Sequence, residues 1–240
     1  MSVRLTPAPS ASSNKGKARS VQHGFLWVGI IAPVLFAAVF TIDGLLKSGY
    51  SASDEAISYL DLGTSGWIQR ANFILFGLLL LVFLVGYVRR MRPIFGQIRL
   101  TIASIFFVIS DLGWMMAGFC VPNPYLAPQV PWPGVLHQIS VIVAFLPFAI
   151  ACFILGVKSI RTRGWRIYGG YSLIFSLPLV IFSFGTITYL MNQNMFGNVN
   201  SPGSGTMQRV GLLVGPLAWY AISALLVMLR TNRKVEIERI

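Results

Sequence analysis

The chain has 240 residues, of which 55% are hydrophobic and only 11% are charged. Soluble domains carry about 25% charged residues, so this composition excludes an ordinary soluble protein and predicts an integral membrane protein. The formal net charge is +12, but Lys and Arg cluster in alternate segments between long apolar runs. That distribution is typical of a multispan membrane protein and argues against a continuous basic surface for nucleic acid.

Six long apolar runs predict an all-α, polytopic membrane protein with a bundle of six transmembrane helices. The bilayer core contains no water that could bond to backbone N–H and C=O groups, so a spanning segment must pair these groups itself, as a helix does. We expect a transmembrane domain over residues 23–230, with spans at about 24–46, 66–88, 100–120, 134–157, 167–191 and 206–229. Residues 1–22 are rich in Ser, Ala and basic residues and are predicted to form a disordered tail, and residues 231–240 a short second tail.

The basic residues indicate the orientation of the spans. In a six-span arrangement, all 19 Lys and Arg residues except Lys47, Arg70 and Arg209 fall on the side that holds both termini. Cytoplasmic segments carry such an excess, so both termini are expected in the cytoplasm. The lipid bilayer is the expected partner, with anionic lipids at the cytoplasmic face.

The polar segment between the first two spans contains three of the seven acidic residues, Asp54, Glu55 and Asp61. The later outer loops, at about 121–133 and 192–205, carry no charge. We expect residues 54–72 to fold as a cap over the outer end of the bundle.

Polar residues near the outer ends of the spans are candidates for ligand binding. They are Asp43, Asp61, Arg70, Asn72 and Arg209. Arginine matches the geometry of phosphate and carboxylate groups, so Arg70 and Arg209 are candidates to bind an anionic headgroup. The alternative is that both arginines reach the headgroup region or pair with neighbouring acids.

Two residues inside the spans are candidates for acid–base chemistry. Asp111 lies in the third span and shares a helix face with Ser104 and Gly118, because the three are seven residues apart. His137 lies at the start of the fourth span. The alternatives are a buried carboxylate that fixes helix packing and a histidine bonded to the Pro-rich loop. No metal site and no cofactor is predicted, because the Cys and His residues lack ligand spacing.

Two further patterns are expected to serve packing. Gly211 and Gly215 form a G-x-x-x-G pair, which lets helices approach closely. Cys120 and Cys152 are expected near opposite membrane faces, too far apart for a disulfide.

Residues 57–81 resemble the first outer loop and second span of an uncharacterised prokaryotic six-span family, the domain of unknown function 998. The residues that fit its two patterns are Asn72, Phe73 and Gly77, then Gly118, Pro122, Pro124, Leu136 and His137. The resemblance covers about residues 24–229 and implies a multi-pass protein of a prokaryotic plasma membrane. It supplies no reaction. The loop at residues 57–63 is also distantly similar to the Frag1/DRAM/Sfk1 family, with different spacing.

The favoured function is a non-enzymatic membrane protein that binds a lipid, an amphiphile or a partner protein in the outer half of the bundle. A homo-oligomer is a further expected assembly. The first alternative is a membrane-embedded enzyme that acts on a lipid through Asp111 and His137. The second is a small proton-coupled transporter that uses Asp111 as its proton site.

Overall fold

The computed structural model describes residues 11–123, 132–192 and 202–237, and within these ranges the chain is all-α without strands. The long helices are α1 (Ala11–Leu46), α2 (Trp67–Phe95), α3 (Gln97–Phe119), α4 (Trp132–Ile160), α5 (Arg166–Asn192), α6 (Ser204–Leu212) and α7 (Ala218–Ile237). A short 3-10 helix, η1 (Ile57–Asp61), precedes α2, and a π-helical turn, η2 (Leu213–Leu217), joins α6 to α7.

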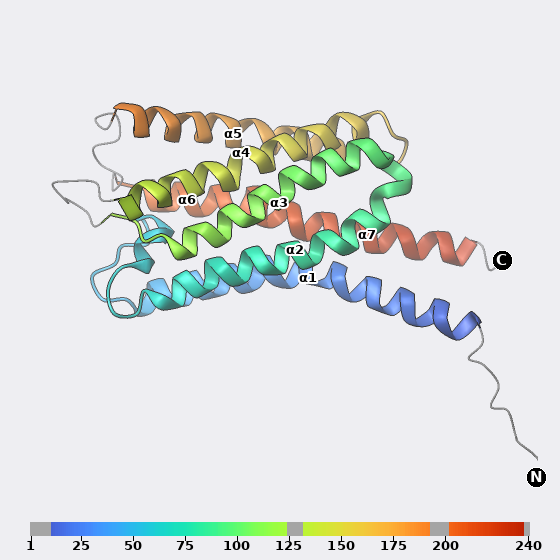
Figure 1. The fold of residues 1–240 in the computed structure, drawn as a ribbon, viewed down its shortest axis with the longest axis horizontal. Helices are drawn as coiled ribbons and strands as arrows, with labels where there is room; N and C mark the ends of the chain where they lie inside the picture. Colours follow the sequence, from blue (N-terminus) through green and yellow to red (C-terminus); the bar gives the residue numbers. More distant parts are fainter. Residues whose placement is uncertain (1–10, 124–131, 193–201, 238–240) are drawn as a thin grey trace, which may run out of the picture.

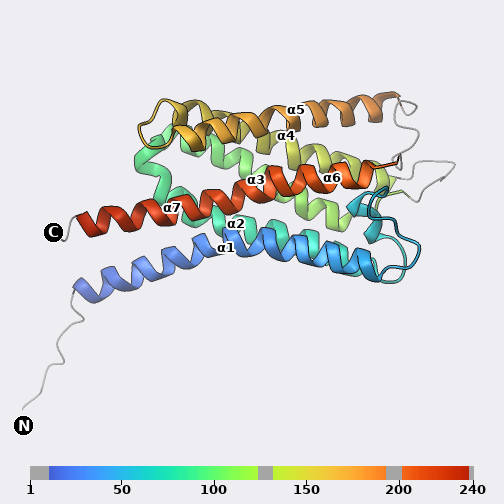
Figure 2. The same cartoon turned by 180° about the vertical axis from the view of Figure 1, so that it is seen from behind.

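The helices lie side by side along one axis (Figure 1). Each of α1 to α4 packs against the next helix in the chain, and α7 returns to pack against α1. Figure 2 shows α6 and α7 running as one interrupted rod between α1 and α5. The start of α1 and the end of α7 lie at the same end of the bundle.

Five segments of the described chain are long and apolar enough to cross a membrane. They are Gly24–Leu46, Trp67–Phe95, Gln97–Phe119, Trp132–Ile160 and Ser204–Arg230. The predicted all-α membrane architecture is therefore confirmed. The sixth predicted span, at about 167–191, coincides with α5, but the side chains of residues 178 and 181–192 are not described. This span stays a prediction.

The predicted disordered tail at residues 1–22 differs from the structure over the part that is described. Helix α1 begins at Ala11, so residues 11–22 are helical rather than disordered, and α7 extends to Ile237. Residues 1–10 and 238–240 lie outside the described ranges. An apolar span has already nucleated the helix, and Ala, Lys, Arg and Gln next to it extend the helix at little cost.

Glycines bring neighbouring helices into backbone contact. A Cβ atom at Gly77 of α2 would lie 2.5 Å from the carbonyl oxygen of Asp111 in α3, and one at Gly113 would lie 2.5 Å from the Ala144 nitrogen in α4. Neither glycine therefore leaves room for a side chain. These contacts hold α2, α3 and α4 together at the depth of Asp111.

The predicted packing role of Gly211 and Gly215 is wrong. Among the described residues, a Cβ atom at either glycine would meet no atom within 4 Å outside its own helical surroundings. Gly215 has φ −84° and ψ −106°, which is not helical, and Pro216 follows it inside the π-helical turn. Proline lacks a backbone N–H and clashes with the preceding helical turn, so this pair interrupts the last span.

Aromatic side chains fill the bundle interior on either side of this interruption. The Trp219 ring of α7 lies 5.0 Å from the Phe107 ring and 5.3 Å from the Phe148 ring, measured between ring centroids. Toward the C-terminal end of α3, the rings of Phe36 and Phe76 stack with their centroids 4.5 Å apart. These contacts form a packed base for the polar residues around η1.

Candidate functional site

Residues 47–66, which we call the cap loop, fold over one end of the bundle, the cap end (Figure 2). The Arg209 guanidinium of α6 donates hydrogen bonds to the carbonyl oxygens of Ala52 at 2.6 Å and Glu55 at 2.9 Å, and to the Tyr50 hydroxyl. Arg209 thus has hydrogen-bond partners within the protein. The partners described are carbonyl and hydroxyl oxygens rather than carboxylates.

The start of α6 makes further bonds to the cap loop. The Gly203 and Thr206 amides donate to Asp54 Oδ1 at 2.9 Å and to the Ser53 carbonyl at 2.8 Å. Gln208 Oε1 accepts a hydrogen bond from the Ile57 amide at 2.7 Å. Hydrogen bonds from Ser51, the Gly203 amide and Ser53 lower the pKa of Asp54. The loop is therefore attached to α6 along several residues. The predicted cap, residues 54–72, belongs to this loop only as far as residue 66, because α2 begins at Trp67.

Lys47 binds backbone carbonyl groups at the C-terminal end of η1. Its Nζ donates to the carbonyl oxygens of Tyr59 at 3.0 Å, Leu60 at 3.0 Å and Leu62 at 2.5 Å. Cations stabilise the free carbonyls at a helix C-terminus. All three ammonium donors of Lys47 are thereby used, so it offers none to the nearby carboxylates.

Asp61 is a buried carboxyl group in η1 without a hydrogen-bond partner for either oxygen. Only 3% of the residue is exposed. Burial raises its pKa to about 8, against the opposing effect of Arg70 and Lys47, and Asp43 raises it further. Asp43 lies near the end of α1 with 6% exposure, and its Oδ2 has no partner.

Asn72 and Gln69 link α2 to α1. The Asn72 amide donates to the Phe36 carbonyl and to Gln69 Oε1, both at 3.1 Å. Gln69 is fully buried, and its Nε2 has no hydrogen-bond partner. Arg70 Nε is likewise buried without one.

Four predicted ligand-binding residues thus gather where α1 ends, η1 lies and α2 begins. They are Asp43, Asp61, Arg70 and Asn72. Sequence reasoning missed two members of this group, Lys47 and Gln69. Lys47 had a signal, because it is the sole basic residue of its loop. Gln69 had a weaker one, because it lies one helical turn before Asn72.

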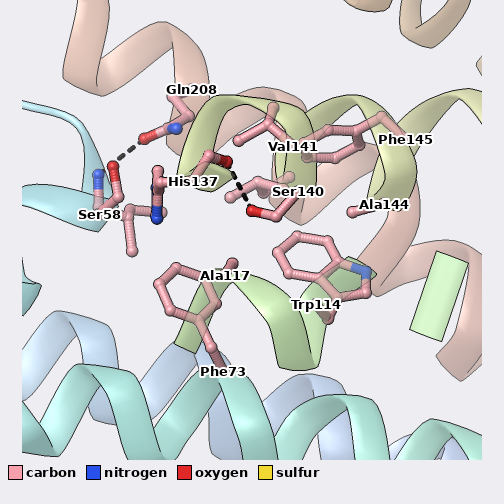
Figure 3. Close-up of a pocket in the computed structure, with 12 residues that line it drawn as sticks. Ser58, Phe73, Trp114, Ala117, His137, Ser140, Val141, Ala144, Phe145 and Gln208 are labelled. Carbon is pink, nitrogen blue, oxygen red and sulfur yellow. Dashed lines mark hydrogen bonds between the residues drawn. The ribbon is translucent and has the colours of Figure 1, made fainter. Parts of the chain in front are cut away.

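A cavity of about 40 Å³ lies beneath the other end of η1, between α2, α3, α4 and α6. Ser58, His137, Ser140 and Gln208 contribute polar groups to its lining, and Phe73 and Trp114 are among its apolar residues (Figure 3). A water molecule needs about 10–15 Å³ of such space, so the cavity accommodates a few waters or one small polar group.

His137 and Asp111 have separate partners. His137 Nδ1 donates to the Cys120 carbonyl at 2.6 Å, just before the Pro-rich segment. Asp111 is fully buried and accepts a hydrogen bond from the Tyr220 hydroxyl at 2.9 Å. The cavity is lined by His137 but not by Asp111. This cavity therefore does not contain both catalytic candidates.

The described residues contain no group of three or more His, Cys, Asp or Glu that is arranged to hold a metal ion. Cys120 and Cys152 are both free thiols.

The model of a family of proteins of unknown function, DUF998, matches residues 30–226. The chain belongs to this family. Among the curated proteins and the solved structures, none matches the chain. The distant similarity to the Frag1/DRAM/Sfk1 family stays a prediction. In this DUF998 protein, two residues of the family patterns have clear structural roles: Gly77 admits the backbone of α3, and His137 ties α4 to the end of α3.

Proposed function

We propose that this DUF998 protein is a six-span membrane protein that binds an amphiphile at the cap end of its bundle. One observation carries the proposal: the cap loop closes over a cavity that combines hydroxyl, imidazole and amide groups with aromatic walls. Ligand sites commonly combine a mainly apolar lining with a few polar groups that fix orientation. An amphiphile reaches such a site from the surrounding bilayer.

The small size of the cavity implies that binding requires movement. Pockets for drug-sized ligands measure about 300–1,000 Å³, well above the 40 Å³ of this cavity. The interruption at Gly215 and Pro216 supplies a place for α6 to pivot, because helical hydrogen bonding is broken there. The cap loop is bonded to α6, so both move together.

Neither alternative function gains a specific observation. Acid–base catalysis by Asp111 and His137 needs both groups at one substrate, whereas each bonds to a different part of the bundle. For proton-coupled transport, the structure offers Asp111 only as the acceptor of a Tyr220 bond.

We infer that both termini are cytoplasmic, in the plasma membrane of a prokaryote. Support comes from the end of the bundle opposite the cap, which we call the basic end. It carries Arg89, Arg90, Arg92, Arg99, Lys158, Arg161, Arg163, Arg166 and Arg230. Such clusters mark the cytoplasmic side, where they also attract anionic lipids.

Cysteine labelling tests this orientation. In a background with Cys120 and Cys152 replaced by alanine, T64C in the exposed part of the cap loop should react with an impermeant maleimide on intact cells. T162C at the basic end should react only after lysis. Labelling of T162C, but not T64C, on intact cells would reverse the proposed orientation.

Filling the cavity tests amphiphile binding. Ser58 lines the cavity from the cap loop and is partly exposed. A phenylalanine at this position should therefore fill the cavity without disturbing the packing of one long helix against another. Protein purified in mild detergent should carry a bound amphiphile, detected by native mass spectrometry, and Ser58→Phe should lower its occupancy about tenfold, corresponding to about 1.4 kcal/mol.

Thr64→Phe is the matched control, because Thr64 lies in the same loop but is exposed. Its occupancy should equal that of the wild type. Equal occupancy in wild type and Ser58→Phe, or a wild type without any amphiphile, would contradict the proposed function.

A further inference from the structure

The group at the junction of α1, η1 and α2 contains buried polar atoms of both kinds without hydrogen-bond partners. The acceptors are both carboxylate oxygens of Asp61 and Oδ2 of Asp43, and the donors are Arg70 Nε and Gln69 Nε2. Buried polar groups are nearly always hydrogen-bonded, and exceptions call for an explanation. Five such atoms around one junction indicate a binding site rather than a packing defect.

The charges of this group suit a ligand that carries both signs. Lys47 is fully occupied by carbonyl oxygens, so it leaves Asp61 and Asp43 without a donor. A cation with several N–H groups would supply the donors that both acids lack, and it would favour the ionised form of Asp61, whose pKa burial raises to about 8. Arg70 is the basic residue that faces Asp61 from α2, and its guanidinium matches an anionic phosphate.

The surroundings place this group at the level of lipid headgroups. Leu45 and Leu46 follow Asp43 with 79% and 80% exposure, and Trp67 begins α2 with 62% exposure. Exposed leucines at the end of a span contact acyl chains, and tryptophan favours the membrane interface. A lipid in the outer leaflet therefore has its headgroup next to Asp43.

We propose that Asp61 and Asp43 bind the primary ammonium group, and Arg70 the phosphate, of an ethanolamine-type zwitterionic headgroup. This inference goes beyond the proposed function, because none of these three residues lines the cavity at the other end of η1. A primary ammonium donates three hydrogen bonds, which the unpartnered carboxylate oxygens accept. The quaternary ammonium of choline donates none, so the site distinguishes the two headgroups.

Lipid titration of the full chain in detergent tests the headgroup preference. Native mass spectrometry should show phosphatidylethanolamine binding at least tenfold more tightly than phosphatidylcholine or phosphatidylglycerol with the same acyl chains. Soluble glycerophosphoethanolamine distinguishes the source of the headgroup. Weak competition supports a membrane lipid, whereas competition as strong as that of the lipid would overturn the lipid assignment.

Variants locate the preference. Asp61→Asn should reduce the affinity for phosphatidylethanolamine about tenfold, to the level of phosphatidylcholine, and Arg70→Gln should weaken binding of all three phospholipids. Glu55→Gln is the matched control, since it removes one negative charge from the same loop and its amide oxygen still accepts the Ser51 amide bond. It should bind as the wild type does.

A measurement of thermal stability shows whether Asp61→Asn loses lipid binding only because it misfolds. Asp61→Asn removes an unpartnered buried carboxylate, so its thermal midpoint without lipid should equal or exceed that of the wild type. Equal wild-type affinities for the ethanolamine and choline lipids, or a preference that Asp61→Asn leaves unchanged, would overturn this inference while the proposed function stands. Absence of any bound amphiphile would overturn both.

Discussion

Replacing Gly113 by alanine is expected to destabilise the bundle strongly, although it adds only one methyl group. The new Cβ atom would lie 2.5 Å from the Ala144 nitrogen, 2.7 Å from the Val143 carbonyl carbon and 2.8 Å from the Ala144 Cα. All three are backbone atoms of α4, which move only if the helices separate. Overpacking costs about 1–3 kcal/mol, and we expect the upper value, which corresponds to roughly 6–12 °C in thermal midpoint.

Gly211→Ala is the matched control for Gly113→Ala. Gly211 is exposed on α6, and a Cβ atom there meets no described atom within 4 Å. Alanine also favours a helix over glycine by about 1 kcal/mol. Thermal unfolding in detergent, followed by tryptophan fluorescence, should show a lowered midpoint for Gly113→Ala and an unchanged or raised one for Gly211→Ala. Equal midpoints for the two variants would refute backbone contact between α3 and α4.

The spans were predictable because their signal is local, whereas the helix contacts are not. Length and hydropathy suffice to place a run of apolar residues in a bilayer. The G-x-x-x-G spacing of Gly211 and Gly215 does not reveal whether another helix faces it, and within the described chain none does so closely. Of the three residues predicted to share one face of the third span, Asp111 and Gly118 are buried and Ser104 is partly exposed.

The candidate site was predictable in part for the same reason. Charge near span ends predicted that Asp43, Asp61 and Arg70 lie at one end of the bundle, and in the structure Asp43 and Arg70 both lie close enough to Asp61 to affect its pKa. The sequence contains no signal that Lys47 binds the carbonyls of η1, because every residue type has the same backbone carbonyl group. It also could not pair Asp111 with Tyr220, which lies 109 residues later in the chain.

Replacing Arg209 by alanine is expected to release the cap loop from α6. The guanidinium holds the carbonyls of Ala52 and Glu55 and the Tyr50 hydroxyl. Hydrogen bonds to charged groups contribute about 1.5–3 kcal/mol each, but Arg209 is half-buried and solvent replaces part of them. We expect a loss of about 2 kcal/mol for loop closure, which is roughly a 30-fold increase in opening.

Hydrogen exchange of the Ile57 amide reports this opening directly, because that amide donates to Gln208 of α6. Its exchange should accelerate about 30-fold in Arg209→Ala and less in Arg209→Lys, which keeps the charge but loses donors. Thr206→Ala is the control, since this exposed side chain lies on α6 and its backbone amide still bonds to Ser53.

If the cap loop and α6 also govern entry to the cavity, a bound amphiphile should leave Arg209→Ala faster by a similar factor. Unchanged exchange at Ile57 would mean that the remaining α6 bonds hold the loop without Arg209. Faster exchange without faster ligand release would place the entry route elsewhere in the bundle.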